Sequence, residues 1–161
     1  MEYIRGDIYQ GNDDYLLQDC DCDTTKAWGF SLKTLTHFPW ANFHESRRAM
    51  PSSDYVALED LPKIGSIEVK EGKPNVVCLY GRYWCGIQKN SHDSFEIRSK
   101  WFEDSLIRLG EHIKSQGHAR RVTVAVPRGL GESPWGESVK LLENFAKEHE
   151  AILSVKVYNQ E

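Results

Sequence analysis

The sequence predicts an α/β fold in which helices cover both faces of a mainly parallel sheet, in three layers. Two observations lead to this prediction. Short apolar runs that resemble strands alternate with longer segments of helical periodicity, and the strongest of those runs are apolar at consecutive positions, as in strands buried on both faces. A chain of 161 residues is long enough for one core, so we expect a single domain spanning residues 1–161.

Several segments have the composition of strands and are bounded by turn residues. The first is followed by a Gly-Asn-Asp-Asp turn, and the run at 120–129 ends in glycines. The expected strands are EYIRGDIY (2–9), YLLQDC (15–20), a segment near SIEVKEG (66–72), NVVCLYGR (75–82), RRVTVAVPRG (120–129) and ILSVKVY (152–158).

Helical spacing of apolar residues indicates a first helix at 29–38, which Pro39 stops. Its apolar positions are Phe30, Leu32, Leu35 and Phe38. The section from 40 to 74 is polar and contains three prolines. There we expect a second short helix and then an excursion that contains the strand near 66–72.

The clearest helix ends before Gly117, and Asp93 with Glu96 form a candidate capping box at its start. A last helix is expected to begin at Ser133 and Pro134, which are typical N-cap and first-turn residues. The apolar stripes of these two helices are Phe95, Phe102, Leu106, Leu109 and Ile113 in one, and Trp135, Val139, Leu142 and Ala146 in the other.

Charge and composition argue against several classes of function. The formal net charge is −4, and the sequence has no basic run, so we expect no sequence-specific or non-specific nucleic-acid binding. No apolar stretch reaches membrane length, and charges at Glu2, Arg5 and Asp7 interrupt any signal-like core, so we expect no membrane partner. Four cysteines without a secretory signal favour reduced thiols in the cytoplasm or nucleus.

In open α/β sheets ligands bind where the carboxyl ends of strands meet helix N-termini, and two segments of this chain fit that description. One is VPRGLGESPW, in which Gly129 and Gly131 can expose backbone amides to an anion. The alternative is an ordinary turn at the end of a strand, because a single G-x-G is common.

The other segment is DCDCDTT, residues 19–25, which precedes the helix at Gly29. The C-x-C spacing has no second cysteine pair or histidine pair, so we expect no metal site and no cofactor. Cys20 and Cys22 fit better as residues on the inward face of a strand. The aspartates fit either a solvated or capping role or the rim of a binding site.

Five motifs in order make the chain resemble the macro domains, proteins that bind ADP-ribose and related nucleotides. It is most similar to the branch of ADP-ribose-1''-phosphate phosphatases, with their fungal and viral relatives. The motifs are GDI (6–8), CDC leading to Gly29, FPWANFHESRR (38–48), VAVPRGLGESPW (124–135) and the terminal VKVY. The resemblance extends over nearly the whole chain.

The resemblance implies a role for each matching position. Asp7 would accept a hydrogen bond from the adenine amino group, and Ile8 would offer its backbone N–H. Tyr158 would stack on adenine, although a half-buried strand tyrosine is the alternative. We call the segment between the strand at 15–20 and the helix at Gly29 the first loop, and the segment around Gly129 and Gly131 the second loop. The remaining implied substrate contacts are Gly29, Phe30 and Ser31 after the first loop, Pro127, Gly129, Leu130 and Gly131 in the second loop, and Asp21 at the distal ribose.

Two functions follow from this resemblance. In the first, the chain binds ADP-ribose or a derivative and hydrolyses a bond at the distal ribose, as an ADP-ribose-1''-phosphate phosphatase or ADP-ribosyl hydrolase, with Asp21 as general base. In the second, it is a non-catalytic reader of ADP-ribose, of ADP-ribosylated protein or of a related signalling nucleotide. The first loop departs from the family, with Ala27 and Trp28 before Gly29 in place of its usual glycine-rich turn, and Gln18 stands where the family often has histidine. Trp28 would then cover the ligand as a lid or fill its site, and a filled site would leave a third function, a scaffold that works only through protein contacts.

Overall fold

The computed structural model describes residues 1–82, 94–131 and 135–159. Within these ranges a six-stranded sheet has the order β1-β6-β5-β2-β4-β3. Neighbouring strands run parallel except for β3 and β4, which are antiparallel, so the predicted mainly parallel sheet is confirmed. The strands are β1 (Glu2–Arg5), β2 (Tyr15–Asp19), β3 (Ile67–Lys70), β4 (Asn75–Leu79), β5 (Val122–Pro127) and β6 (Leu153–Asn159).

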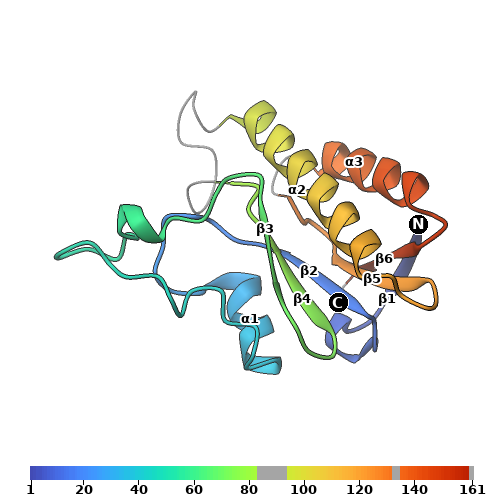
Figure 1. Cartoon of the computed structure of the whole chain (residues 1–161), viewed down its shortest axis with the longest axis horizontal. Coiled ribbons are helices and arrows are strands. Elements are labelled where there is room, and N and C mark those ends of the chain that lie inside the picture. Colours follow the sequence, from blue (N-terminus) through green and yellow to red (C-terminus); the bar gives the residue numbers. More distant parts are fainter. Residues whose placement is uncertain (83–93, 132–134, 160–161) are drawn as a thin grey trace.

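The predicted three layers are also confirmed (Figure 1). Helices α2 (Phe95–Ser115) and α3 (Trp135–Glu148) cover one face of the sheet, and α1 (Gly29–His37) lies against the other. Side chains alternate between these faces along a strand, so Leu17 packs toward α2 and α3 while Leu16 packs toward α1. No helix in the described ranges is both long and apolar enough to span a membrane.

The first strand is shorter than predicted, because it ends at Arg5 and the chain then turns. Gly6 has a φ of +140°, which favours glycine, and the Asp7 carboxylate accepts a hydrogen bond from the Tyr9 amide at 2.9 Å. Residues Ile8–Gln10 therefore form a short 3₁₀ helix, η1, instead of continuing the strand.

Helix α1 has the predicted position but not the predicted buried face. Leu32 is 49% exposed, whereas Ser31 and Thr34 are buried. The Thr34 hydroxyl is 3.0 Å from the hydroxyl of Tyr9, so part of this helix is held by a polar contact that apolar periodicity does not reveal. In the fully described segment 40–74, the predicted second helix is only a 3₁₀ turn, η2 (Leu58–Asp60).

The ends of α2 agree with the sequence in part. In the structure Ser94 is the N-cap of α2, and its side chain accepts a hydrogen bond from the Ile97 amide at 3.2 Å. Asp93 itself lies outside the described residues, as do Ser133 and Pro134, the predicted start of α3. Gly117 follows the end of α2 with a φ of +58°, as expected of a C-terminal glycine.

The α2/α3 side of the core should carry much of the stability. Leu109 of α2 is fully buried, so Leu109→Ala should lower the free energy of unfolding by about 2–5 kcal/mol through lost burial and a residual cavity. Leu32→Ala is the matched control, because that leucine is half exposed, and it should change stability by less than about 0.5 kcal/mol. Urea denaturation measures both, and equal effects would contradict the observed burial.

Candidate functional site

The carboxyl ends of β1, β6, β5 and β2 lie next to one another at one edge of the sheet. The parallel register places Tyr158 of β6 beside Pro127 of β5. Past the strands, the Arg128 amide donates to the Tyr158 carbonyl at 3.0 Å, and the Gly131 amide donates to the Asp19 carboxylate at 3.2 Å. The segments that follow these strands therefore meet at this edge, which we call the strand-end site.

Asp7 lies where β1 leaves the sheet, at the N-cap of η1. Its side chain is exposed, and one carboxylate oxygen accepts the Tyr9 amide at 2.9 Å. Ile8 is 3% exposed and packs into the α1 side of the core, so it fixes the position of the turn. An exposed carboxylate on an anchored turn is suited to accept a hydrogen bond from a ligand amine.

The loop after β5 carries the two predicted glycines with left-handed backbones. Gly129 has a φ of +93° and Gly131 a φ of +98°. A Cβ on Gly129 would meet nothing within 4 Å, whereas a Cβ on Gly131 would lie 2.8 Å from the Ser138 hydroxyl of α3. Leu130 between them is buried against the α2/α3 core and anchors the loop. The loop thus has open space beside Gly129, while Gly131 is confined.

Asp21 lies in the segment after β2, as predicted, but its carboxylate is enclosed. It is 1% exposed, and one carboxylate oxygen accepts from the Thr24 amide at 3.0 Å and from the Thr24 hydroxyl at 2.6 Å. The other oxygen accepts from the indole N–H of Trp28 at 2.9 Å. The guanidinium of Arg47 lies 3.7 Å from the carboxylate and donates to the Asp21 carbonyl at 3.0 Å.

These contacts do not fit the predicted role of Asp21 as a general base. Burial alone would raise its pKa, but the hydrogen bonds from Thr24 and Trp28, together with the charge of Arg82, hold the pKa below its usual range. A general base needs access to water and a pKa near the working pH. In this structure Asp21 instead holds the first loop in shape as a buried hydrogen-bond acceptor.

Trp28, Gly29, Phe30 and Ser31 form the start of α1 beside Asp21. Trp28 is 41% exposed, and the guanidinium of Arg82 lies 5.3 Å from the centre of its ring. Gly29 has a φ of +57°, and the Ser31 hydroxyl donates to the Trp28 carbonyl at 2.8 Å. The indole therefore faces solvent in part, while its N–H is committed to the first loop.

Tyr158, for which the resemblance implies stacking on adenine, is buried in this structure. It is only 4% exposed, and its hydroxyl donates to the Asp13 carboxylate at 2.6 Å. Burial and this hydrogen bond raise the pKa of Tyr158. The ring lies inward because the buried Asp13 requires a donor, and because Gly11, whose Cβ would collide with the Tyr158 hydroxyl, leaves room for it.

Two buried residues near the first loop were not predicted as parts of this site. Arg47 is 7% exposed and donates to the carbonyl of Thr24 at 2.8 Å in addition to that of Asp21, so it ties the segment after α1 to the first loop. His44 is 6% exposed. Both belong to FPWANFHESRR, one of the five motifs on which the resemblance depends.

Cys20 and Cys22 are buried, as predicted, although they follow β2 instead of lying in a strand. Cys20, Cys22 and Cys78 are free thiols on the α1 side of the core. Burial raises the pKa of Cys22 to about 12. Among the described residues, no group of three or more His, Cys, Asp or Glu side chains is arranged to hold a metal ion.

The fold resembles that of several solved macrodomains. The macrodomain of Mycobacterium tuberculosis DarG matches with a TM-score of 0.68 and 16% identity, over 98% of this chain and 95% of that one. Thermosipho africanus DarTG in complex with ADP-ribose matches with a TM-score of 0.66 and 14% identity, over 99% of this chain and 42% of that one. The Oceanobacillus iheyensis macrodomain with ADP matches with a TM-score of 0.58 and 10% identity, over 97% and 81%.

These similarities define the architecture as that of the macrodomain fold, since identities this low establish a fold and not an activity. No family model and no curated protein matches the chain.

His44 makes the stability of the fold dependent on pH. Burial, with a further contribution from Arg47, lowers its pKa from 6.5 to about 4. The unfolded chain therefore binds a proton at this histidine between pH 6.5 and 4 while the folded chain does not, so stability falls as the pH is lowered through this window. We expect His44→Gln to flatten this part of the profile in urea denaturation measured from pH 7 to pH 4.

The control for this experiment is His37→Gln, which changes an exposed histidine. It should leave the slope between pH 6.5 and 4 as in the unmodified chain. A His44→Gln profile as steep as that of the unmodified chain would show that His44 is not the group responsible.

Proposed function

We propose that this chain binds ADP-ribose or a close derivative at the strand-end site. The observation that carries the proposal is that the exposed Asp7 carboxylate follows β1 and the Gly129–Gly131 loop follows β5, two strands that end at the same edge of the sheet. Support comes from the macrodomain fold, because two of the similar structures hold ADP-ribose or ADP.

In this proposal Asp7 accepts a hydrogen bond from the adenine amine and the Ile8 amide donates to the ring. A carboxylate has only acceptors, so it selects an amine and disfavours a carbonyl at the same position. The amides of the second loop hold the diphosphate next to Gly129, where the space is open. The remaining contacts are Pro127, Leu130 and Gly131 in that loop, and Gly29, Phe30 and Ser31 at the start of α1.

Asp19 sets a condition on phosphate binding. Its carboxylate already accepts a hydrogen bond from the Gly131 amide at 3.2 Å. A bound diphosphate therefore either makes no bond to this amide or displaces the Asp19 carboxylate from it. Stacking by Tyr158 would likewise require its ring to leave Asp13. We therefore assign adenine selection to Asp7 and Ile8 first.

Hydrolysis at the distal ribose, of the ADP-ribose-1''-phosphate phosphatase or ADP-ribosyl hydrolase type, is the finer form of the proposal. It would depend on positioning by the two loops and on a water near the scissile bond. Asp21 would serve as base only if the first loop opened, because its carboxylate is 1% exposed here.

The enclosure of Asp21 favours a second candidate function, a non-catalytic reader. Such a protein would bind ADP-ribose, or protein that carries it, and release it unchanged. A cytoplasmic or nuclear location suits both functions, since both act on intracellular nucleotides or modified proteins.

Isothermal titration calorimetry with ADP-ribose tests binding. We expect a dissociation constant in the micromolar range, about −7 to −8 kcal/mol. Asp7→Ala removes a hydrogen bond to a charged group and should weaken binding by about tenfold or more. Glu150→Ala removes an exposed carboxylate after α3 and should leave affinity unchanged. No heat with ADP-ribose, or equal affinity in all three proteins, would contradict the proposed site.

A turnover assay separates the two candidate functions. ADP-ribose-1''-phosphate and ADP-ribosylated protein are incubated with the chain, and released phosphate and ADP-ribose are measured. Product formation that Asp7→Ala slows supports the hydrolase. Binding of ADP-ribose without any product supports the reader.

A further inference from the structure

A pocket of about 220 Å³ lies on the α1 face of the sheet, away from the strand-end site. It is located at the opposite, amino-terminal ends of β2 and β4, since Asp13 precedes β2 and Pro74 precedes β4. Its lining shares only Ile8 with the strand-end residues considered above. The lining residues are Ile8, Tyr9, Gln10, Asn12, Asp13, Leu16, Phe38, Lys73, Pro74 and Ala125.

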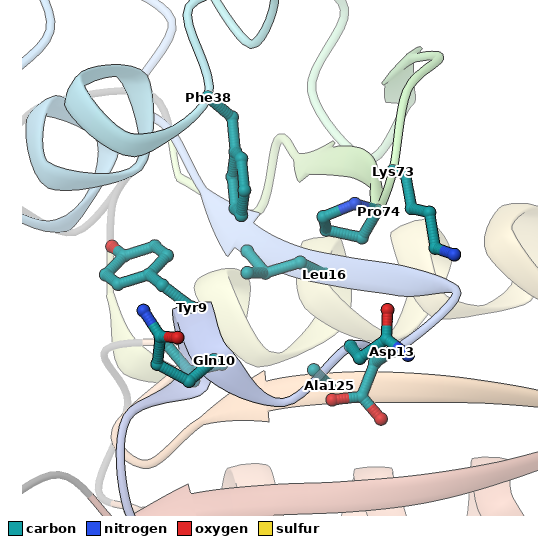
Figure 2. Close-up of a pocket in the computed structure, with 10 residues that line it drawn as sticks. Tyr9, Gln10, Asp13, Leu16, Phe38, Lys73, Pro74 and Ala125 are labelled. Carbon is teal, nitrogen blue, oxygen red and sulfur yellow. The ribbon is translucent and has the colours of Figure 1, made fainter.

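Local packing explains why the pocket is present. Leu16 and Ala125 are register partners on β2 and β5, and the small side chain of Ala125 leaves space above the sheet. Figure 2 shows Leu16 in the middle of the view, with Phe38 and Pro74 on one side of it and Asp13 and Ala125 on the other.

An aromatic wall closes another side of the pocket. The ring of Tyr9 stacks on His37 with centroids 4.1 Å apart, meets Phe38 edge-on at 5.8 Å, and places its hydroxyl 3.0 Å from that of Thr34. These contacts join η1 to α1 and hold the wall in position. The walls are therefore preformed, as in most small-molecule sites.

Asp13 is the polar group that gives the pocket a chemical preference. It is 4% exposed; its Oδ2 accepts the Tyr158 hydroxyl, and its Oδ1 has no hydrogen-bond donor among the described residues. The nearest cation to Oδ1 is the ammonium of Lys156, at 3.4 Å. The ammonium compensates the charge of Asp13, but Oδ1 still has no hydrogen bond within the described residues, and a ligand N–H group would supply one.

We propose that this pocket is a second ligand site, for a flat one- or two-ring heterocycle that carries N–H donors. Its volume lies below the roughly 300–1,000 Å³ of sites for drug-sized ligands, so it suits a single small ring system. The ring lies between Tyr9, Phe38 and Leu16, and its donors face Asp13. Lys73 lies exposed at the rim of the pocket. Its ammonium disfavours a positively charged group on the side of the ligand that faces solvent.

Two-dimensional ¹H–¹⁵N NMR of the full chain tests this proposal with 2-aminopyridine as the probe. We expect saturable shifts confined to residues 8–13, Leu16, Phe38, Lys73 and Ala125. The matched ligand 2-methylpyridine has the same shape but lacks the amino donors, and it should bind at least tenfold more weakly. Shifts centred on Gly129 and Gly131, no saturable shifts, or equal binding of the two compounds would overturn the proposal.

Two variants locate the site. Ala125→Leu fills the space above the sheet and should abolish the shifts, whereas Ala151→Leu, the same change at an exposed alanine, should leave them as they are. Asp13→Asn keeps an acceptor for Tyr158 and the side-chain volume but removes the charge, and should weaken binding at least tenfold. The dispersion of each spectrum reports folding. If Ala125→Leu does not fold, the affinity of Asp13→Asn for 2-aminopyridine decides whether the pocket is the binding site. Unchanged binding in that variant would refute the site.

Discussion

The parallel register of β1, β6, β5 and β2 is the constraint on which the strand-end site depends. Because the backbone hydrogen bonds fix Tyr158 beside Pro127, the segments that leave these strands have to start at the same edge. Only then can the turn at Asp7 lie near the glycines after β5, which are separated from it by more than a hundred residues. The helices contribute by burying both faces, so the sheet cannot shift its register without exposing one set of apolar side chains.

Buried polar groups organise the α1 side, whereas the cluster packed under α2 and α3 is mainly apolar, with Arg98, Ser105 and Ser138 also buried there. Asp21 collects donors from Thr24 and Trp28 and lies near Arg47, and Asp13 takes the hydroxyl of Tyr158. The Asp21 carboxylate joins Thr24 and Trp28 to the segment that carries Arg47, and the Asp13 carboxylate joins the turn before β2 to β6 through Tyr158. Such networks stabilise one arrangement because leaving any member unpaired is costly.

Local signals in the sequence were sufficient for the layers, most strands and the glycines after β5. They did not reveal which side chains a distant partner would bury. Leu32 fits a helical stripe, yet Thr34 is buried because Tyr9 reaches it from η1. Tyr158 has the position of a stacking ring, but Asp13, far away in the chain, draws it inward. The burial of Asp21 and Arg47 likewise comes from contacts that no local pattern encodes.

The order of the sheet leaves β1 and β3 as its two edges, and each is only four residues long. Both carry charged side chains, Glu2 and Arg5 on one and Glu68 and Lys70 on the other. Short edges offer few free backbone groups to a strand from another molecule, and covering their charged side chains would carry a desolvation cost. The molecule is thereby protected against edge-to-edge polymerisation, and its central strands stay inaccessible to aggregation partners.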